Sequence, residues 1–560
     1  MAITLKTVAN SDDVFLVWQS DQSLEGCLGF AIYRKRNGGN PELLKNRVGF
    51  ESSTEKPPQL STVWPFQRIS WTDHGANTGD AMSYQVVAMM GQPGQLTPGI
   101  KSAWSPTVKL STSCGPNVEA VFNRGFVLSQ FVSRLMKEHE WGPSDLKKNV
   151  AMVNNSVRQF LSGDLRVRLL EMLDTAASNA HIELYAALFE LTDEELTDRL
   201  AQLGKRLHLV LANGAIKKKG DDENEKQRRK LERAGCDVHD RMCAPGFLGH
   251  NKFVVACFDD SPTMVWTGSA NWMPTGLCTQ LNNAVLIRNS GLATDYRNAW
   301  QRLVDAGDKK GKDLVDGNSA DPSEWNLDKD PKDGSVFARF TAVRDGVDID
   351  ELKQLIADAK HNIYFAMFMP GADIYDAVIK KTNSTYVRGV TNSFPQRPKG
   401  ASPDADAAEV AVQLTDGKPE NIQKLRVVRP EGVANAFGKW AEEVTRKQFA
   451  AIGHSIIHSK CLVLDYGHPS VAVVTGSHNF SKTASSKNDE NYLVVKGHQG
   501  LADAFLVNIF AAYDHYSWRT YVADCARRKV KPWQNLSDDP KWYQRYVRTS
   551  RRKAFLSEWF

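Results

Sequence analysis

The chain contains the stretches HSKCLVLD at 458–465 and GSHN at 476–479, and both have an earlier counterpart. The counterparts are HNKFVVAC at 250–257 and GSAN at 268–271, each placed 208 residues before its partner. The same offset relates Asn282 to Glu490. A constant offset over several separated elements indicates a duplicated structural unit, so the fold is expected to consist of two related halves.

The residue types in this pattern favour a phosphate ligand. Side chains two apart on a strand share a face, so the His and Lys of each copy point the same way. The following apolar run ends in a Gly, which lets the backbone approach a ligand closely, and in Ser and Asn, which supply neutral donors. Two copies facing each other would surround a phosphodiester with two lysines and two imidazoles. The expected site residues are His250, Lys252, Ser269, Asn271, His458, Lys460, Asp465, Ser477, Asn479 and Glu490.

The doubled His-x-Lys-(x)4-Asp and Gly-Ser-x-Asn pattern resembles the repeated motif of the phospholipase D superfamily. That superfamily includes phospholipases D, cardiolipin synthases, tyrosyl-DNA phosphodiesterases and metal-independent nucleases. The resemblance implies an α/β fold, a pseudo-dimer of two phospholipase D-like α/β/α sandwich halves with one active site in one chain. It also implies catalysis with no metal and no other cofactor. In the family one His attacks phosphorus to give a covalent phosphohistidine, and the other protonates the leaving oxygen and then activates water or an alcohol.

The two copies differ at the motif aspartate. Asp465 completes the second copy, whereas the first has Cys257, followed by Asp259 and Asp260 two and three residues later. In the family this Asp is more a structural member than the attacking group. The resemblance therefore implies that its loss leaves the chemistry in place.

A second difference sets the expected roles of the histidines. Glu490 aligns with Asn282, and a carboxylate on the far ring nitrogen supports an imidazolium better than an amide does. Family members with such an asymmetry pair the carboxylate of one half with the histidine of the other. The resemblance thus implies that Glu490 orients His250 as the nucleophile and that His458 is the general acid and base.

Composition places the chain among ordinary globular proteins. Its 560 residues carry a net charge of only +5, and eight cysteines without a Cys-x-x-Cys pair favour reduced thiols over a zinc site. No apolar run reaches the ~20 residues of a membrane span, and the first residues lack the plan of a signal peptide. A cytoplasmic protein is expected, with secretion independent of a signal left open.

Three domains are predicted. Residues 1–112 contain short β-rich runs and resemble a fibronectin type III sandwich, which would serve as a docking module for a protein partner or as architecture alone. Residues 113–315 and 316–560 form the two halves, with a basic aromatic tail at the end of the second. Their βαβ rhythm predicts mostly parallel sheets, with a strand at 157–161, a surface linker at 308–334 and a long loop at 393–420.

Two charged segments have more than one interpretation. Ten bases and the aromatic residues Trp533, Trp542, Tyr543 and Tyr546 lie in the tail from Arg527 to Lys553. This composition suits a nucleic-acid backbone, an anionic lipid surface or a helical cap on the sheet. The stretch from Lys217 to Arg233 is either a solvated helix or a nucleic-acid arm.

The leading functional prediction is hydrolysis of a phospholipid to phosphatidate and a head-group alcohol, with a membrane surface as partner. A metal-independent DNA or RNA nuclease is the alternative, favoured by the tail and by the Glu490/Asn282 asymmetry, which resembles the tyrosyl-DNA phosphodiesterases. A third reading is a catalytically weakened binding protein.

Overall fold

The computed structural model describes residues 2–21, 24–125, 135–216, 218–328, 334–393, 395, 427–428, 457–527, 529–532, 534–543 and 555–560. The chain forms two compact units. One comprises residues Met1–Thr112, Ala408–Arg446 and Leu506–Phe560, and the other Ser113–Ala407 and Lys447–Phe505. The predicted loop at 393–420 lies outside the described residues except at positions 393 and 395.

The N-terminal unit is built on two antiparallel sheets, so the all-β prediction for residues 1–112 is confirmed. Their strands are β1 (Ile3–Ala9), β2 (Val14–Ser20) and β7 (Ser70–Asp73) in one sheet, and β3 (Cys27–Arg36), β4 (Glu42–Leu43), β8 (Ala81–Gln92), β9 (Gln95–Lys101) and β10 (Val108–Lys109) in the other. A short pair, β5 (Lys45–Asn46) and β6 (Gln59–Leu60), stands apart. Trp18, Phe30 and Val86 are fully buried, as expected of a sandwich core. The likeness to a fibronectin type III domain stays a prediction.

The C-terminal segment packs on this β module, although the sequence placed it with the second half. Phe510 of helix α14 (Gln499–Arg527) lies 4.6 Å from Phe15, measured between ring centroids. Farther on, Trp542 donates from Nε1 to the Cys27 carbonyl at 2.9 Å, and Tyr543 Oη accepts from the Ser20 amide at 3.0 Å. Trp542 and Tyr543 are buried, so neither is free to stack on bases or to enter a lipid surface. Trp533 and Tyr546 lie outside the described residues.

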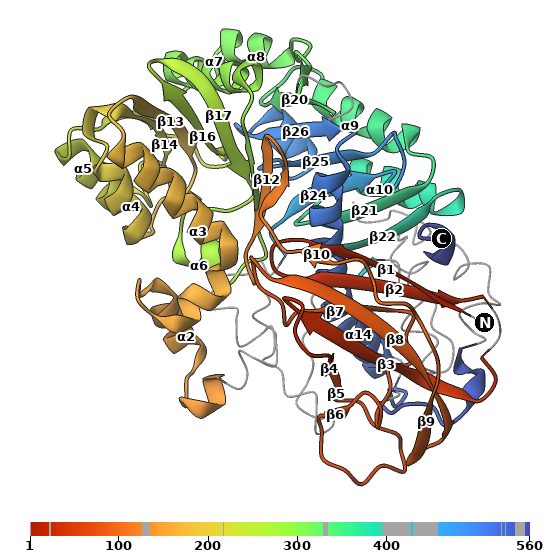
Figure 1. The fold of residues 1–560 in the computed structure, drawn as a ribbon. Coiled ribbons are helices and arrows are strands. Elements are labelled where there is room, and N and C mark those ends of the chain that lie inside the picture. The colour runs from red at the N-terminus through yellow and green to blue at the C-terminus, as the bar shows by residue number, and fades with distance from the viewer. Residues whose placement is uncertain are drawn as a thin grey trace. The chain divides into compact units, whose positions relative to one another are not determined.

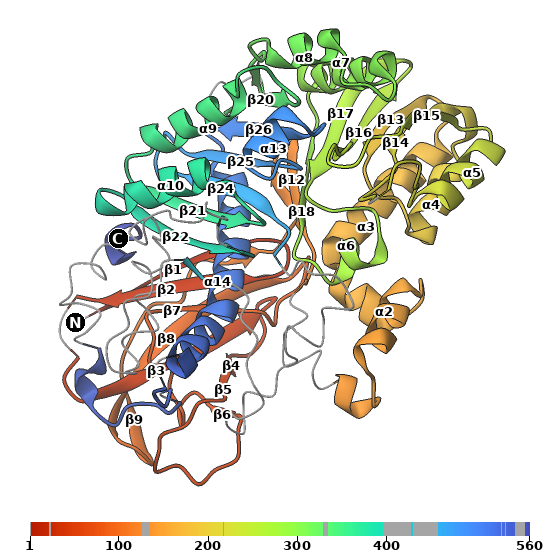
Figure 2. The same ribbon diagram turned by 180° about the vertical axis from the view of Figure 1, so that it is seen from behind.

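The second unit contains two sheets with the same strand order, which confirms the predicted pair of α/β halves (Figures 1 and 2). The first sheet runs β11-β12-β18-β17-β16-β13-β14-β15, and the strands of the second half within this unit run β19-β20-β26-β25-β24-β21-β22. The first-half strands are β11 (Ser113–Gly115), β12 (Val118–Phe122), β13 (Ile182–Leu188), β14 (Leu207–Ala212), β15 (Asp237–Arg241), β16 (Lys252–Phe258), β17 (Ser261–Gly268) and β18 (Asn283–Ile287). Those of the second half are β19 (Trp325–Asn326), β20 (Ser335–Phe340), β21 (Asn362–Met367), β22 (Tyr386–Thr391), β24 (Lys460–Leu464), β25 (Ala472–Gly476) and β26 (Asn491–Lys496).

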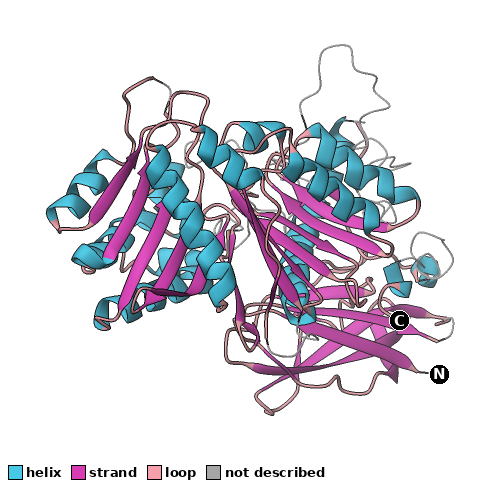
Figure 3. Ribbon diagram, turned by 90° about the horizontal axis from the view of Figure 1, so that it is seen from above, coloured by secondary structure: helices cyan, strands magenta, loops and turns pink. Residues whose placement is uncertain are grey.

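Helices flank these sheets (Figure 3). They are α2 (Pro143–Ala151), α3 (Ser156–Ser178), α4 (Glu194–Ala201), α5 (Glu225–Arg233), α6 (Pro274–Cys278), α7 (Ser290–Ala306), α8 (Lys312–Ser319), α9 (Val347–Asp358), α10 (Ala372–Lys380) and α13 (Lys482–Ser486). In the first half α3 packs on β12 and β13, and α7 packs on β17. No helix among the described residues combines the length and the apolar character that crossing a membrane would require.

Three local predictions are wrong. The sheets are mixed rather than mostly parallel, because the motif strands β16 and β17, like β24 and β25, follow each other as antiparallel neighbours. Residues 157–161 begin helix α3 rather than forming a strand, since Asn155 caps the helix and accepts from the Val157 amide. The predicted linker at 308–334 contains helix α8 and strand β19.

The second part of the charged stretch forms helix α5 (Glu225–Arg233), and several of its cations are paired with acids of the same unit. Lys226 and Lys230 both reach Glu194, and Arg228 pairs with Asp222 and Asp240. These pairings favour the solvated helix over the nucleic-acid arm.

Candidate active site

The starts of two equivalent strands carry the four basic motif residues. Lys252 begins β16 and Lys460 begins β24, and each histidine stands two residues earlier. Each lysine turns back to donate from Nζ to the carbonyl of its own histidine, at 2.7 Å in the first half and 2.6 Å in the second. His250 and His458 are both buried, with 5% of each residue's surface exposed. The duplicated sequence therefore produces duplicated geometry.

A phenylalanine backs each histidine and lysine. The ring of Phe189 lies 4.8 Å from His250, and that of Phe368 lies 4.9 Å from His458. The same rings lie 4.9 and 5.0 Å from the ammonium groups of Lys252 and Lys460. An apolar wall of this kind excludes water and strengthens the charge interactions within the site.

The acceptors of the two imidazoles cross between the halves. His250 Nδ1 lies 3.1 Å from Glu490 Oε2, and His458 Nδ1 lies 2.9 Å from Asn282 Oδ1. Asn282 donates from Nδ2 to the carbonyls of Gly276 and Gln280, which leaves its oxygen as the atom facing His458. An acceptor at Nδ1 places the ring proton there, so Nε2 of each histidine carries the free lone pair.

Burial and the paired lysines shift the titration of the site. Burial and the nearby Lys252 lower the pKa of His250 to about 4, against the raising effect of Glu490. Burial, Lys460 and Lys252 hold the pKa of His458 well below its usual value. Burial also lowers the pKa of Lys252 to about 7 and that of Lys460 well below its normal range. Two ammonium groups buried together favour an anion between them, because an anion restores the charged form of both.

The two Gly-Ser-x-Asn turns are closed by their serines. The Ser269 amide donates to the Asn283 carbonyl at 3.0 Å, and its Oγ accepts from the Asn283 amide at 3.1 Å. Ser477 makes the same two bonds with Asn491, at 2.9 and 3.0 Å. Ser269 Oγ also lies 2.8 Å from Asn282 Oδ1. Both hydroxyls are thus engaged in holding the strand ends.

The motif asparagines have different surroundings. Asn271 donates from Nδ2 to the carboxylate of Glu190, a residue that the sequence reasoning did not select. Asn479 stands in the equivalent place in the second half and is partly exposed.

Asp465 lies outside this cluster, which corrects its place among the expected site residues. It follows the last residue of β24, roughly 16 Å along the strand from Lys460. Its carboxylate accepts from the amides of Lys360 and His361, both at 2.8 Å, and from Ser470 Oγ at 2.9 Å. The aspartate therefore fixes the entry into β21 instead of touching a ligand.

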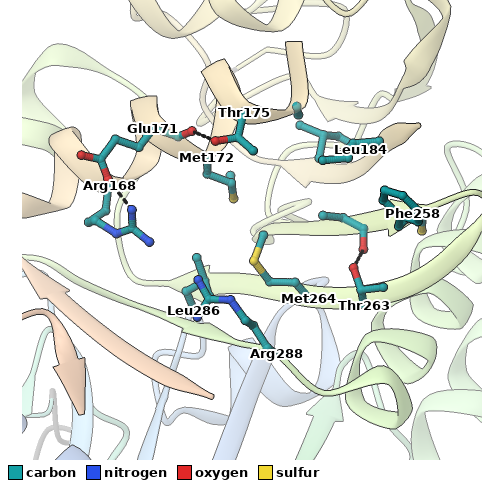
Figure 4. Close-up of a pocket in the computed structure, with 14 residues that line it drawn as sticks. Arg168, Glu171, Met172, Thr175, Leu184, Phe258, Thr263, Met264, Leu286 and Arg288 are labelled. Carbon is teal, nitrogen blue, oxygen red and sulfur yellow. Dashed lines mark hydrogen bonds and ion pairs between the residues drawn. The ribbon is translucent and has the colours of Figure 1, made fainter. Parts of the chain in front are cut away.

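At the equivalent end of the first half Cys257 replaces the aspartate, and Asn179 Oδ1 accepts from the His181 amide at 3.0 Å. Cys257 lies on the wall of a cavity of about 360 Å³ between helix α3 and strands β13, β16, β17 and β18 (Figure 4). The wall is largely apolar, with Met172, Leu184 and Met264 among its residues. None of the ten expected site residues lines this cavity.

The structure adds polar contacts between the two halves that were not predicted from the sequence. Thr267 Oγ1 donates to Asn491 Oδ1 at 2.7 Å, and Thr475 Oγ1 donates to Asn283 Oδ1 at 2.8 Å. These residues obey the same 208-residue offset, so extending the repeat beyond the motif would have found them. Asn123 donates to the carbonyls of Leu277 and Gln280 and thereby holds the loop that carries Asn282. No motif in the sequence indicated this role.

A buried pair, Arg241 and Asp489, also joins the halves beside Glu490. Arg241 Nε and Nη2 donate to the Asp489 carboxylate at 2.8 and 3.0 Å, and both side chains are 1% exposed. Among the residues that the structure describes, no group of three or more His, Cys, Asp or Glu side chains could hold a metal ion.

Comparison with known proteins was made by family and by structure. A family model described as cardiolipin synthase, PLD-like domain matches residues 169–304 and 352–509, which together exceed half of the chain. No curated protein sequence matches the chain.

Solved structures give weaker likenesses. Phosphatidylserine synthase from Haemophilus influenzae Rd KW20 is 13% identical with a TM-score of 0.43, over 69% of this chain and 98% of that one. Yeast tyrosyl-DNA phosphodiesterase is 10% identical with a TM-score of 0.31, over 57% of this chain and 86% of that one. Nuc from Salmonella typhimurium, a phospholipase D family member, is 19% identical with a TM-score of 0.19, over 33% and 94%.

Proposed function

The chain belongs to the family of phospholipase D-like domains, whose members act on phosphodiesters, and from this premise we propose the reaction that it catalyses. The proposed reaction is hydrolysis of a phospholipid to phosphatidate and a head-group alcohol, through a covalent phosphohistidine and without a metal ion.

The observation that carries the proposal is the crossed support of two buried histidines. Each imidazole faces an acceptor of the opposite half at Nδ1, so Nε2 is the ring nitrogen that would take part in the chemistry. The supports differ in charge, because Glu490 is a carboxylate and Asn282 an amide. This difference gives the two histidines different roles.

The roles follow from where positive charge develops. His250 Nε2 attacks phosphorus, the bond from phosphorus to the head-group oxygen breaks, and His458, which enters the step protonated at both ring nitrogens, gives its Nε2 proton to that oxygen. The phosphorylated imidazole of His250 is cationic, and the adjacent Glu490 carboxylate stabilises it. In the second step His458 takes a proton from water, the water oxygen bonds to phosphorus, and the bond from His250 to phosphorus breaks.

The two lysines act on the phosphate in both steps. Lys252 and Lys460 are buried beside the histidines, and an ammonium in such a place stabilises the charge that builds on the phosphoryl oxygens. Their depressed pKa values return toward normal once the anionic substrate binds.

One observation supports a phospholipid as the substrate. The matching family model carries the name of cardiolipin synthase, an enzyme of phospholipid chemistry. Trp542 and Tyr543 are buried against the β module, which removes them from the argument for a nucleic acid and equally from the argument for a lipid surface. The membrane partner and the docking role of the β module belong to the same proposal.

The test measures turnover of mixed phospholipid vesicles and of labelled single- and double-stranded DNA and RNA, all with EDTA present. His250→Ala is the inactive variant, and His181→Ala is its control, because His181 is exposed and pairs with Asp259 at the far end of the sheet. Phosphatidate release that is lost only in His250→Ala supports the proposal. Cleavage of nucleic acid alone would replace the substrate class, and no turnover of either would favour a weakened binding protein.

A further inference from the structure

The cavity of the first half lies away from the histidines, on the side of the sheet that helix α3 covers. Ala256 of β16 lines it, four residues along the strand from Lys252, a separation of roughly 13 Å. The second half has Leu464 at the position of Ala256, and that leucine is buried. The first half therefore has a methyl group where the second has an isobutyl group, and the smaller side chain leaves space beside Cys257.

The middle of the cavity is apolar. Met172 of α3 lies across the hollow from Met264 of β17, with Leu184 of β13 beside them (Figure 4). Water in such a place finds few hydrogen-bonding partners, so an apolar group that displaces it gains free energy. A cavity of about 150 Å³ admits benzene, so at the same volume per atom the 360 Å³ of this one admits about fourteen non-hydrogen atoms.

Two arginines stand on one side of this hollow (Figure 4). Both donate to the carboxylate of Glu119: Arg168 reaches its two oxygens at 2.8 and 2.9 Å, and Arg288 reaches one of them from Nη2 at 2.7 Å. The Arg288 side chain is 44% exposed. A guanidinium carries several N–H donors, so Arg288 retains donors for a second carboxylate.

The other polar groups of the lining leave this role to Arg288. Glu171 pairs with Arg168, and its side chain is 52% exposed, so water and salt screen its charge. Thr175 and Thr263 donate their hydroxyls to backbone carbonyls. An apolar interior with a few polar groups at one end is typical of sites that bind small amphiphilic ligands.

We propose that this cavity binds a fatty acid of about twelve carbons. Its carboxylate accepts from Arg288, and its alkyl chain lies among Met172, Leu184 and Met264. A neutral amphiphile of the same length fills the apolar part but gains nothing from the guanidinium. The site is separate from the two histidines, and the inference does not depend on the reaction proposed above.

The experiment is equilibrium dialysis of the full chain against radiolabelled dodecanoate, below the concentration at which it forms micelles. We expect the wild type to bind one equivalent. Dodecanol should bind about tenfold more weakly or worse, as hydrogen bonds to charged groups ordinarily contribute. This comparison requires no variant.

Two variants divide the site into its apolar and charged parts. Ala256→Leu introduces the residue of the second half and should weaken dodecanoate binding by about tenfold or more, because it takes the room of about three ligand carbons. Arg288→Gln should reduce the preference for dodecanoate over dodecanol to within about threefold. Lys496→Gln is the matched control: Lys496 stands at the equivalent strand end, pairs there with Glu324 and should leave both affinities unchanged.

Each contrary outcome overturns the proposal at a stated point. Equal wild-type affinities for dodecanoate and dodecanol would remove the role of Arg288. Dodecanoate binding that a folded Ala256→Leu leaves unchanged would place the ligand elsewhere on the chain. No binding by the wild type would show that the cavity takes no fatty acid. None of these results bears on phospholipid turnover, so the proposed function stands or fails separately.

Discussion

The two halves of the second unit have the same backbone arrangement and differ in the polar groups that surround the two histidines. Both have the same sheet order, the same lysine turned onto its histidine carbonyl, and a phenylalanine behind each imidazole. They differ at the Nδ1 support, where Glu490 serves His250 and Asn282 serves His458. A symmetric scaffold thus offers two equivalent reactive atoms, and the asymmetric acceptors distinguish them.

The halves also differ away from the reactive atoms. In the second half His478 lies with Nε2 3.1 Å from Asp348 Oδ2, and both side chains are fully buried. The first half has Ala270 at the position of His478. Likewise, Asp465 fixes one strand entry where Cys257 borders a cavity in the other half. The second half carries these polar supports, and the first carries Glu190 beside Asn271.

The largest expected effect comes from removing either histidine. His250→Ala and His458→Ala should each lower kcat/KM on phospholipid by about 10⁴-fold or more, because groups that act as a unit fail together. A nitrophenyl phosphodiester needs no acid for its leaving group, so His458→Ala should release one equivalent of nitrophenol and trap a phosphate on His250. Peptide mass spectrometry locates the phosphate. A burst from His250→Ala with the phosphate on His458 would reverse the roles.

The next effect concerns the unequal acceptors. Glu490→Gln should lower kcat by about 10³-fold, since the cationic phosphohistidine loses its counter-charge.

His250 must be neutral to attack, and its pKa is about 4, whereas His458 must be protonated and burial holds its pKa well below 6.5. The pH optimum of kcat/KM should therefore lie below 6.5.

Asn282→Asp tests the same point in the opposite direction. A carboxylate at His458 Nδ1 raises the pKa of that imidazole, so His458 stays protonated to higher pH and the falling limb of the profile moves upward. The profile is measured on protein shown to be folded, because the carbonyls of Gly276 and Gln280 lose the Asn282 donor and keep only Asn123. A falling limb that does not move would show that His458 is not the acid.

A smaller effect is expected at the buried pair of the second half. His478→Ala copies the first half but leaves the buried Asp348 carboxylate without its His478 partner, so we expect the free energy of unfolding to fall by about 3 kcal/mol. Urea unfolding measures it. Asp348→Ser combined with His478→Ala should recover part of that loss; an additive or larger loss would show that the two side chains do not act as a pair.

The smallest effect is expected at the strand clamp. Asp465→Asn keeps one acceptor but loses the charge that holds the Lys360 and His361 amides, and it should cost about 2 kcal/mol of unfolding free energy. Because Asp465 lies away from the histidines, kcat should stay within about threefold. Cys257→Ser is the matched control in the other half. A large fall in kcat at unchanged stability would return Asp465 to the site.

Much of the local structure could be predicted from the sequence. The buried strands at 182–188 and 207–212 are apolar runs bounded by polar residues, a pattern that leaves few alternatives to a strand. The prediction of a strand at 157–161 was wrong because a five-residue mixture of apolar and polar types fits a strand and a helix equally. The prediction of mostly parallel sheets was wrong because the alternation of strands and helices describes only part of each half.

The sequence by itself determined that the chain is duplicated and that each half presents a histidine and a lysine at a strand start. Residues two apart on a strand share a face whatever surrounds them, so a constant offset is enough. Only the tertiary structure decided that Asn282 supports His458 across 176 residues, that Glu190 lies at Asn271 and that Asp465 does not join them. These partners are chosen by how the two folded halves meet, and contacts between distant segments leave no periodic trace along the chain.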